Sequence, residues 1–147
     1  MHVHRNARGC DFFFAAPCLQ RCSSMRALAS HACEPVRGDR ILVLKQSWLA
    51  LILQGVKTHE VRPGNYRGGK WYLGSKGMIY AQCQLGHAVR VETLRQWRRL
   101  QKFHKHSSRT RPYGDKTHVM PILSLHEIRR PYYHPRGAIG VVRYVPA

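Results

Sequence analysis

Residues 51–62, LILQGVKTHEVR, carry the pattern that decides the fold. Trp48, Leu51 and Ile52 lie at positions i, i+3 and i+4, which is the spacing of one apolar face of a helix. Gly55 follows at the place where many helices end in a left-handed residue, a conformation that glycine adopts without a steric cost from a Cβ atom. The chain is therefore expected to leave an apolar helix at this glycine and to begin a strand soon afterwards.

Four polar side chains follow the predicted helix end. If residues 59–62 form a strand, side chains alternate between its two faces, so Glu60 and Arg62 share one face. Lys57 and Thr58 lie in the connection that leads into this strand. Two interpretations fit this pattern: a solvated turn that carries an ion pair, or a binding site held by a rigid support.

A family resemblance favours the binding site. The segment Gly55–Arg62, GVKTHEVR, resembles the GxKTxExR signature of ASCH domains, and Lys45 on the preceding short strand fits the same pattern. Residues 77–86 resemble the central strand of that family, and residues 131–144 resemble its closing strand. ASCH domains are small PUA-like modules associated with RNA. The resemblance implies an α+β fold, namely a small PUA-like β-barrel of five or six strands with two covering helices.

Length and composition agree with a single globular domain. The chain has 147 residues, of which 44% are hydrophobic, enough to bury one core. No run of eighteen apolar residues occurs, so no membrane-spanning helix is expected. A net charge of +18 attracts polyanions, and nucleic acid fits better than a membrane surface. The expected partner is RNA or a nucleotide, and the chain is expected to be a monomer that does not bind membranes.

The charge divides the chain in two. Residues 40–147 hold twenty basic and four acidic side chains, whereas residues 1–39 hold five and three. The first segment is rich in Arg, Ser, Ala and Cys, which is typical of an organellar transit segment or of a dispensable leader upstream of Met25. We therefore predict a poorly ordered leader over residues 1–39 and an ASCH-like domain over residues 40–147. The protein is expected inside the cell, and in an organelle if the leader is a transit segment.

No metal or other cofactor is expected. Cys18 and Cys22 have a spacing that zinc ligands use, but no second pair completes a set of four. The odd number of cysteines argues against a disulfide framework, and Cys83, in a predicted strand, is expected in the core. The later histidines lie in basic surroundings without carboxylate partners at an orienting spacing. They are His104, His106, His118, His126 and His134.

Hydrophobic periodicity and turn residues place the remaining elements. Ser47 is the expected N-cap of the first helix, and Thr93 opens a second helix with Trp97 facing the core. Residues 104–116 are expected to form a polar, flexible insert. The predicted strands cover residues 41–44, 59–62, 71–73, 78–91 with a bulge at Gly86, 119–128 and 138–144.

The second helix and the insert after it are the best candidates for contact with a nucleic acid backbone. Between Thr93 and Gly114 the chain has no Asp or Glu. The basic side chains expected to bind phosphate there are Arg95, Arg98, Arg99, Lys102, Lys105, Arg109 and Arg111, with Arg67 on an earlier loop. The aromatic residues expected to stack on bases are Tyr66, Trp71 and Tyr113.

Two functions follow from these residues. The first is an RNA-binding module in which Lys57, Glu60 and Arg62 hold a nucleotide or a modified base. The second is a small amidohydrolase acting on acetylated cytidine-type nucleosides, which some similar ASCH proteins hydrolyse. In that case Lys57, Thr58 and Glu60 would be catalytic. The chain departs from those enzymes, because they have a second hydroxyl residue where this chain has Glu60, and a carboxylate from the later helical segment.

Overall fold

The computed structural model describes residues 34–147, so most of the predicted leader, including Cys18 and Cys22, lies outside the described residues. The two helices are α1 (Gln46–Leu53) and α2 (Leu94–His104). A short 3-10 turn covers Gly114–Lys116. The strands are β1 (Arg40–Val43), β2 (His59–Arg62), β3 (Gly69–Ser75), β4 (Met78–Leu85), β5 (Val89–Arg90), β6 (His118–Tyr133) and β7 (Gly140–Arg143).

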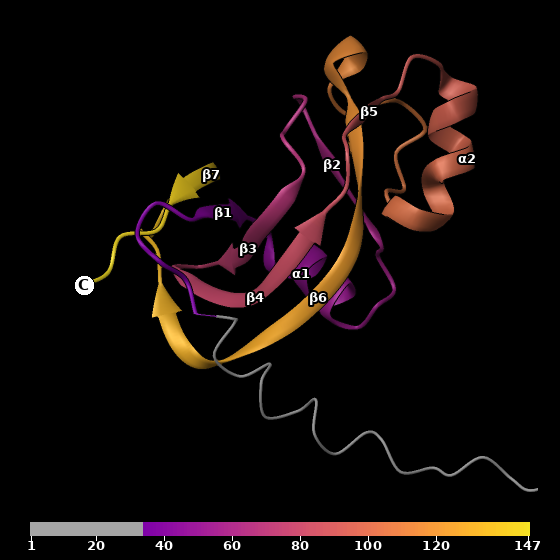
Figure 1. The fold of residues 1–147 in the computed structure, drawn as a ribbon. Helices are drawn as coiled ribbons and strands as arrows, with labels where there is room; N and C mark the ends of the chain where they lie inside the picture. The colour runs from indigo at the N-terminus through magenta and orange to yellow at the C-terminus, as the bar shows by residue number, and fades with distance from the viewer. Residues whose placement is uncertain (1–33) are drawn as a thin grey trace, which may run out of the picture. The chain divides into compact units, whose positions relative to one another are not determined.

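The strands form one mixed sheet that curls into an open, PUA-like barrel (Figure 1). Its order is β2-β6-β4-β3-β1-β7, and β5 also pairs with β6. Only β1 and β3 run parallel in this order, and the other pairs are antiparallel. The long strand β6 joins the two parts of the sheet, because its first residues lie between β2 and β5 while the rest pairs with β4. The α+β class expected from the sequence is confirmed.

Helix α1 ends as predicted at Gly55. This glycine has a φ of +73°, the left-handed conformation that favours glycine. Its N–H donates to the Ile52 carbonyl, and the Val56 N–H donates to the Leu51 carbonyl, which together form a Schellman motif. The start differs from the prediction: Lys45, rather than Ser47, is the N-cap residue.

Helix α2 begins where the sequence predicts. The Thr93 hydroxyl accepts a hydrogen bond from the Gln96 N–H, and the Gln96 side chain accepts one from the Thr93 N–H. This reciprocal capping box fixes the first turn of the helix. Trp97 is buried, as predicted, together with Val61, Val91 and Val119. Packing of α2 on β2 therefore holds the helix beside the GVKTHEVR segment.

The main core lies between the sheet and α1. It includes Leu42, Leu49, Ile52, Leu73 and Cys83, so Cys83 is a core residue as expected. Burial raises the pKa of the Cys83 thiol to about 12, which makes it unreactive. Trp71 is also in this core, with only 2% of its surface exposed. The prediction that Trp71 offers a stacking surface to bases is therefore wrong, because its ring is covered.

The predicted long strand over residues 78–91 is two strands. The Gly86 N–H still donates to the Pro121 carbonyl, but the ladder with β6 breaks until Val89. A Cβ atom at Gly86 would come within 2.6 Å of the Pro121 ring, so the close approach at this break requires glycine. Because of this break, residues 34–147 contain seven strands, one more than the six that the sequence predicts. Strand β6 is also longer than the predicted strand over residues 119–128 and continues to Tyr133.

Residues 34–39 contact the sheet. The Gly38 N–H donates to the Tyr144 carbonyl, and the Tyr144 N–H donates to the Asp39 carbonyl. The Tyr72 hydroxyl donates to the Glu34 carbonyl. Among residues 34–147, no helix has the length and apolar character needed to cross a membrane.

Candidate functional site

Lys57 lies at the centre of the GVKTHEVR segment and is only 1% exposed. Its ammonium group donates to the His59 carbonyl at 2.7 Å and to the His104 carbonyl at 3.1 Å. It also lies 3.2 Å from Glu60 Oε2 and 5.1 Å from the centre of the Trp48 ring. An ammonium has three protons, and the two main-chain carbonyls accept two of them.

Glu60 lies between two cations on β2, as the alternation of side chains predicts. Its Oε1 atom is 3.0 Å from Arg62 Nε, and Arg62 also donates to the Val43 carbonyl. Neither ion pair of Glu60 has the geometry of a hydrogen bond. The carboxylate is only 5% exposed, and its Oε2 atom has no hydrogen-bond donor. Glu60 therefore keeps an unused acceptor in a buried place, where such a group costs about 1–3 kcal/mol.

Burial governs the electrostatics of this cluster. Removal from water lowers the pKa of Lys57, an effect that Glu60 opposes and Arg62 reinforces. Burial also lowers the pKa of the His59 imidazole, and the positive charge of Lys57 lowers it further. Thr58, the remaining polar residue of the segment, is exposed and shares a 3.0 Å hydrogen bond with His59 Nδ1. Lys57, Glu60 and Arg62 thus form one charged unit, with Thr58 at its outer side.

The C-terminal end of α2 covers Lys57. His104 is fully buried, and its ring stacks on Trp97 with centroids 3.8 Å apart. His104 Nδ1 accepts from the His106 N–H, so the neutral ring carries its proton on Nε2 and donates to the Trp97 carbonyl. His106 in turn stacks on Trp48 at 4.4 Å. Burial lowers the pKa of both histidines to about 4, so both are neutral near pH 7.

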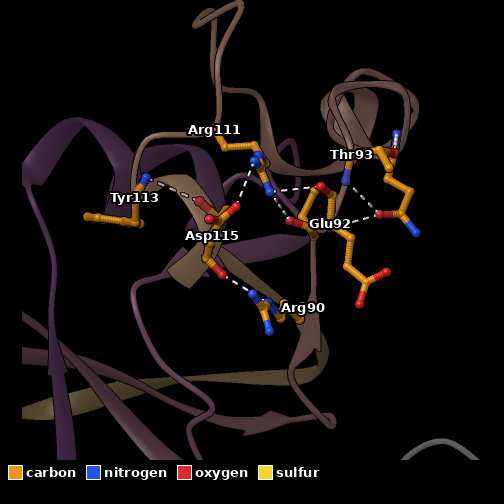
Figure 2. A network of polar contacts seen from close by, with 9 residues as sticks. Arg90, Glu92, Thr93, Arg111, Tyr113 and Asp115 are labelled. Atoms are coloured by element: carbon orange, nitrogen blue, oxygen red, sulfur yellow. Dashed lines mark hydrogen bonds and ion pairs between the residues drawn. The ribbon is translucent and has the colours of Figure 1, made fainter.

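The basic residues predicted to bind phosphate divide into two groups. Six of them are exposed, and they lie on α2 or on the segment after it. These six are Arg95, Arg98, Arg99, Lys102, Lys105 and Arg109. The seventh, Arg111, is half-buried and occupied by the protein: it donates to the Val91 and Glu92 carbonyls and pairs with Asp115 at 3.0 Å (Figure 2).

The insert after α2 is therefore attached to the sheet at a defined point. Arg90 Nε donates to the Asp115 carbonyl, and the Tyr113 N–H donates to the Thr117 hydroxyl (Figure 2). Together with Arg111, these bonds hold residues 111–117 beside β5. The predicted flexible insert over residues 104–116 does not include this attachment. The sequence does not show which main-chain carbonyls an arginine will bind, because those carbonyls belong to distant residues.

Of the other predicted contact residues, Tyr66 and Arg67 lie just before β3. Tyr66 is half-buried and tilted against Trp71, and Arg67 is exposed. Sequence reasoning missed Arg40, whose guanidinium lies 4.2 Å above the Trp71 ring and donates to the Arg67 carbonyl. Tyr113 is 42% exposed beside Arg111.

A groove of about 270 Å³ lies between β5 and α2, and sequence reasoning did not predict it. Its lining includes Val89, Arg90, Arg99, Lys102 and Phe103. No sequence signal could have found it, because it depends on the break after β4 and on the placement of α2.

Residues 34–147 contain no group of three His, Cys, Asp or Glu side chains arranged to hold a metal ion. Their histidines are used in other ways. His104 and His106 stack on tryptophans, and His134 Nδ1 faces the Pro135 carbonyl.

One kind of comparison, with solved structures, supports this architecture. No protein-family model matches the sequence, and no curated protein matches it. Among solved structures, the chain is similar to a serine-to-alanine mutant of ZmASCH from Zymomonas mobilis, with a TM-score of 0.59 and 15% sequence identity. The similarity covers 76% of this chain and 92% of the ZmASCH chain. At this identity the likeness concerns the fold: the chain has an ASCH-like, PUA-type fold.

Proposed function

We propose that this chain is an RNA-binding module of the ASCH type whose Lys57–Glu60–Arg62 cluster holds a nucleotide or a modified base. The observation that carries the proposal is the surface of α2 and the segment after it. This surface presents six exposed cations, and Thr93–Gly114 contains no carboxylate. Such a surface attracts phosphates without regard to sequence.

The unused acceptor of Glu60 supports selection of a base. A glutamate accepts hydrogen bonds from the exocyclic amino group of a base, as it does from cytosine N4. Lys57 and Arg62 flank the carboxylate at 3.2 Å and 3.0 Å and hold it in position. Because Lys57 is buried, is bound by two main-chain carbonyls and lies beside the Glu60 carboxylate, we assign it the role of positioning Glu60 and not of touching the base.

The amidohydrolase remains a second candidate on one observation, the lowered pKa of Lys57. A neutral lysine is a nucleophile, and burial moves Lys57 toward that form. Its three contacts all favour the ammonium form, so the binding function is preferred. Incubation of the full-length chain with acetylated cytidine, followed by product analysis, tests this candidate. Released acetate that disappears in Lys57→Ala would establish hydrolysis and overturn our preference.

The RNA proposal is tested by titrating a short fluorescent single-stranded RNA with the full-length chain at increasing salt. Log affinity is expected to fall linearly with log salt, with a slope of about −0.7 for each phosphate contact. Replacement of Arg98, Arg99 and Lys102 by Gln is expected to weaken binding and to make the slope shallower.

The matched control removes three exposed cations elsewhere, by replacing Arg37, Arg129 and Arg136 with Gln. Both variants lose the same net charge, so a general effect of charge would weaken both equally. A salt-independent affinity, or equal losses in the two variants, would contradict the proposed surface.

A further inference from the structure

The groove between β5 and α2 combines an apolar interior with a cationic rim. Val89 is 59% exposed, and Val91, which is 1% exposed, lies at the bottom of the groove. Arg90, Arg99 and Lys102 line the same groove, and no carboxylate does. An exposed apolar surface bordered by charges of one sign matches a ligand that has an apolar part and an anionic part.

Packing and hydrogen bonds hold the two sides of the groove in place. Leu100, from α2, packs against the buried cluster of Val61, Val91, Trp97 and Val119. The capping box fixes the start of α2, and Arg111 bonds to the Val91 carbonyl beside the groove (Figure 2). A site with such supports loses little conformational freedom when a ligand enters.

Phe103 connects this groove with the charged cluster. Its half-buried ring lines the groove, lies 4.7 Å from the His59 ring, and has the Lys102 ammonium 4.9 Å from its centre. Its carbonyl accepts from the Thr58 N–H. The groove therefore borders the GVKTHEVR segment at Thr58 and His59.

We propose that this groove is a second nucleotide subsite, in which one unpaired base packs against Val89 and Phe103 while Arg99 and Lys102 contact the adjoining phosphates. The inference rests on the proposed RNA-binding function and adds a place where one further base is held. Aromatic and apolar surfaces beside cations are the usual support for single-stranded RNA, and they accept every base.

Size favours a nucleotide over an acidic peptide. Pockets for drug-sized ligands measure about 300–1,000 Å³, and this groove of about 270 Å³ suits one small group. An amphipathic peptide helix instead needs a long groove that takes anchors over two or more turns.

The test compares two substitutions in the full-length chain, Val89→Glu in the groove and Val145→Glu as the control. Both valines are 59% exposed, and both changes lower the net charge equally. Binding of a short uridylate RNA is measured by fluorescence anisotropy, and folding by circular dichroism. Val89→Glu is expected to weaken binding at least about fivefold relative to Val145→Glu, because the loss of one held base costs that much or more.

A second pair separates the groove from the general basic surface. Arg99 lines the groove and Arg98 does not, although both are exposed neighbours on α2. Arg99→Gln is expected to weaken binding more than Arg98→Gln. Photo-crosslinking with 4-thiouridine RNA is expected to label the peptides that contain Val89 or Phe103.

Each outcome has a distinct meaning. If the wild-type chain binds RNA but Val89→Glu equals Val145→Glu, the subsite is wrong and the proposed function stands. If the wild-type chain binds no RNA, both are wrong. If an acidic peptide binds in a manner sensitive to Val89→Glu while RNA binding is not, the groove is a peptide site and the nucleotide assignment is overturned.

Discussion

At the scale of single residues, Glu60 is a buried carboxylate with one oxygen that has no hydrogen-bond partner. Burial of a carboxylate is tolerated only when charges and hydrogen bonds replace water. Lys57 and Arg62 supply the charges, but Oε2 receives no hydrogen bond. A base amino group that reached Oε2 would supply the missing hydrogen bond.

Glu60→Gln is expected to reduce discrimination between RNAs with and without amino-bearing bases. The amide keeps the size of the side chain but loses the charge that a donor prefers, and one good base contact is worth about 1–3 kcal/mol. Competition binding with cytidylate and uridylate oligonucleotides measures the ratio. Glu127→Gln, an exposed carboxylate on β6, is the control. Unchanged discrimination in Glu60→Gln would mean that Glu60 only braces its neighbours.

Arg62→Ala is expected to lower the free energy of unfolding. The side chain is 13% exposed, and it joins β2 to the Val43 carbonyl at the end of β1 as well as to Glu60. Its loss removes the hydrogen bond to the Val43 carbonyl and one of the two ion pairs of the buried Glu60, which lowers the free energy of unfolding by about 2–4 kcal/mol. Urea unfolding measures this change. Arg67→Ala, at an exposed side chain, should change it by less than about 0.5 kcal/mol.

At the scale of elements, the end of α2 determines what surrounds Lys57. The last carbonyl groups of a helix carry partial negative charge, and the His104 carbonyl directs that charge at the Lys57 ammonium. Two histidine–tryptophan stacks close the same region. The lysine is therefore buried by a helix that follows it by more than thirty residues in the sequence.

The histidines at this helix end predict a pH dependence of stability. Their folded pKa of about 4 lies below the usual 6.5, so the unfolded chain binds more protons between these values. The contribution of these two histidines to the free energy of unfolding is therefore fully present above about pH 6.5 and is lost as the pH drops toward 4. His106→Phe keeps an aromatic ring on Trp48 but cannot titrate, so its thermal unfolding midpoint should fall less over this range. An identical fall in both proteins would contradict the assignment.

At the scale of the whole molecule, the described fold brings the start of the described chain to its C-terminal strand. Gly38 and Asp39 exchange main-chain hydrogen bonds with Tyr144, and the Arg143 guanidinium donates to the Gly38 carbonyl. The Tyr72 hydroxyl adds a bond to the Glu34 carbonyl. These contacts close the β1–β7 side of the sheet.

Truncation tests the predicted domain boundary. A chain that begins at Glu34 retains these bonds, whereas one that begins at Arg40 loses them. Both are expected to fold, but the shorter chain should have a free energy of unfolding lower by about 2–6 kcal/mol, because each of the four hydrogen bonds contributes about 0.5–1.5 kcal/mol. Urea unfolding of the two chains measures the difference. An unfolded product from the Glu34 start would show that the domain needs the preceding residues.

Several features could be predicted from the sequence because short-range rules control them. The left-handed Gly55, the capping box at Thr93, the burial of Trp97 and the shared face of Glu60 and Arg62 depend on neighbours a few residues away. Backbone sterics and hydrophobic periodicity act at that range. The ASCH-like fold is predicted from a family resemblance, carried by residues 55–62 and supported by residues 77–86 and 131–144.

Tertiary structure decided the features that depend on distant segments. Lys57 is buried because α2 ends above it, Trp71 is hidden from solvent because the core closes over it, and Arg111 is occupied by carbonyls of residues 91 and 92. The groove exists because β4 breaks at Gly86 and α2 packs beside β5. Burial, cavities and the pairing of charges are set by which surfaces meet in space, and a local pattern carries no information about its distant partner.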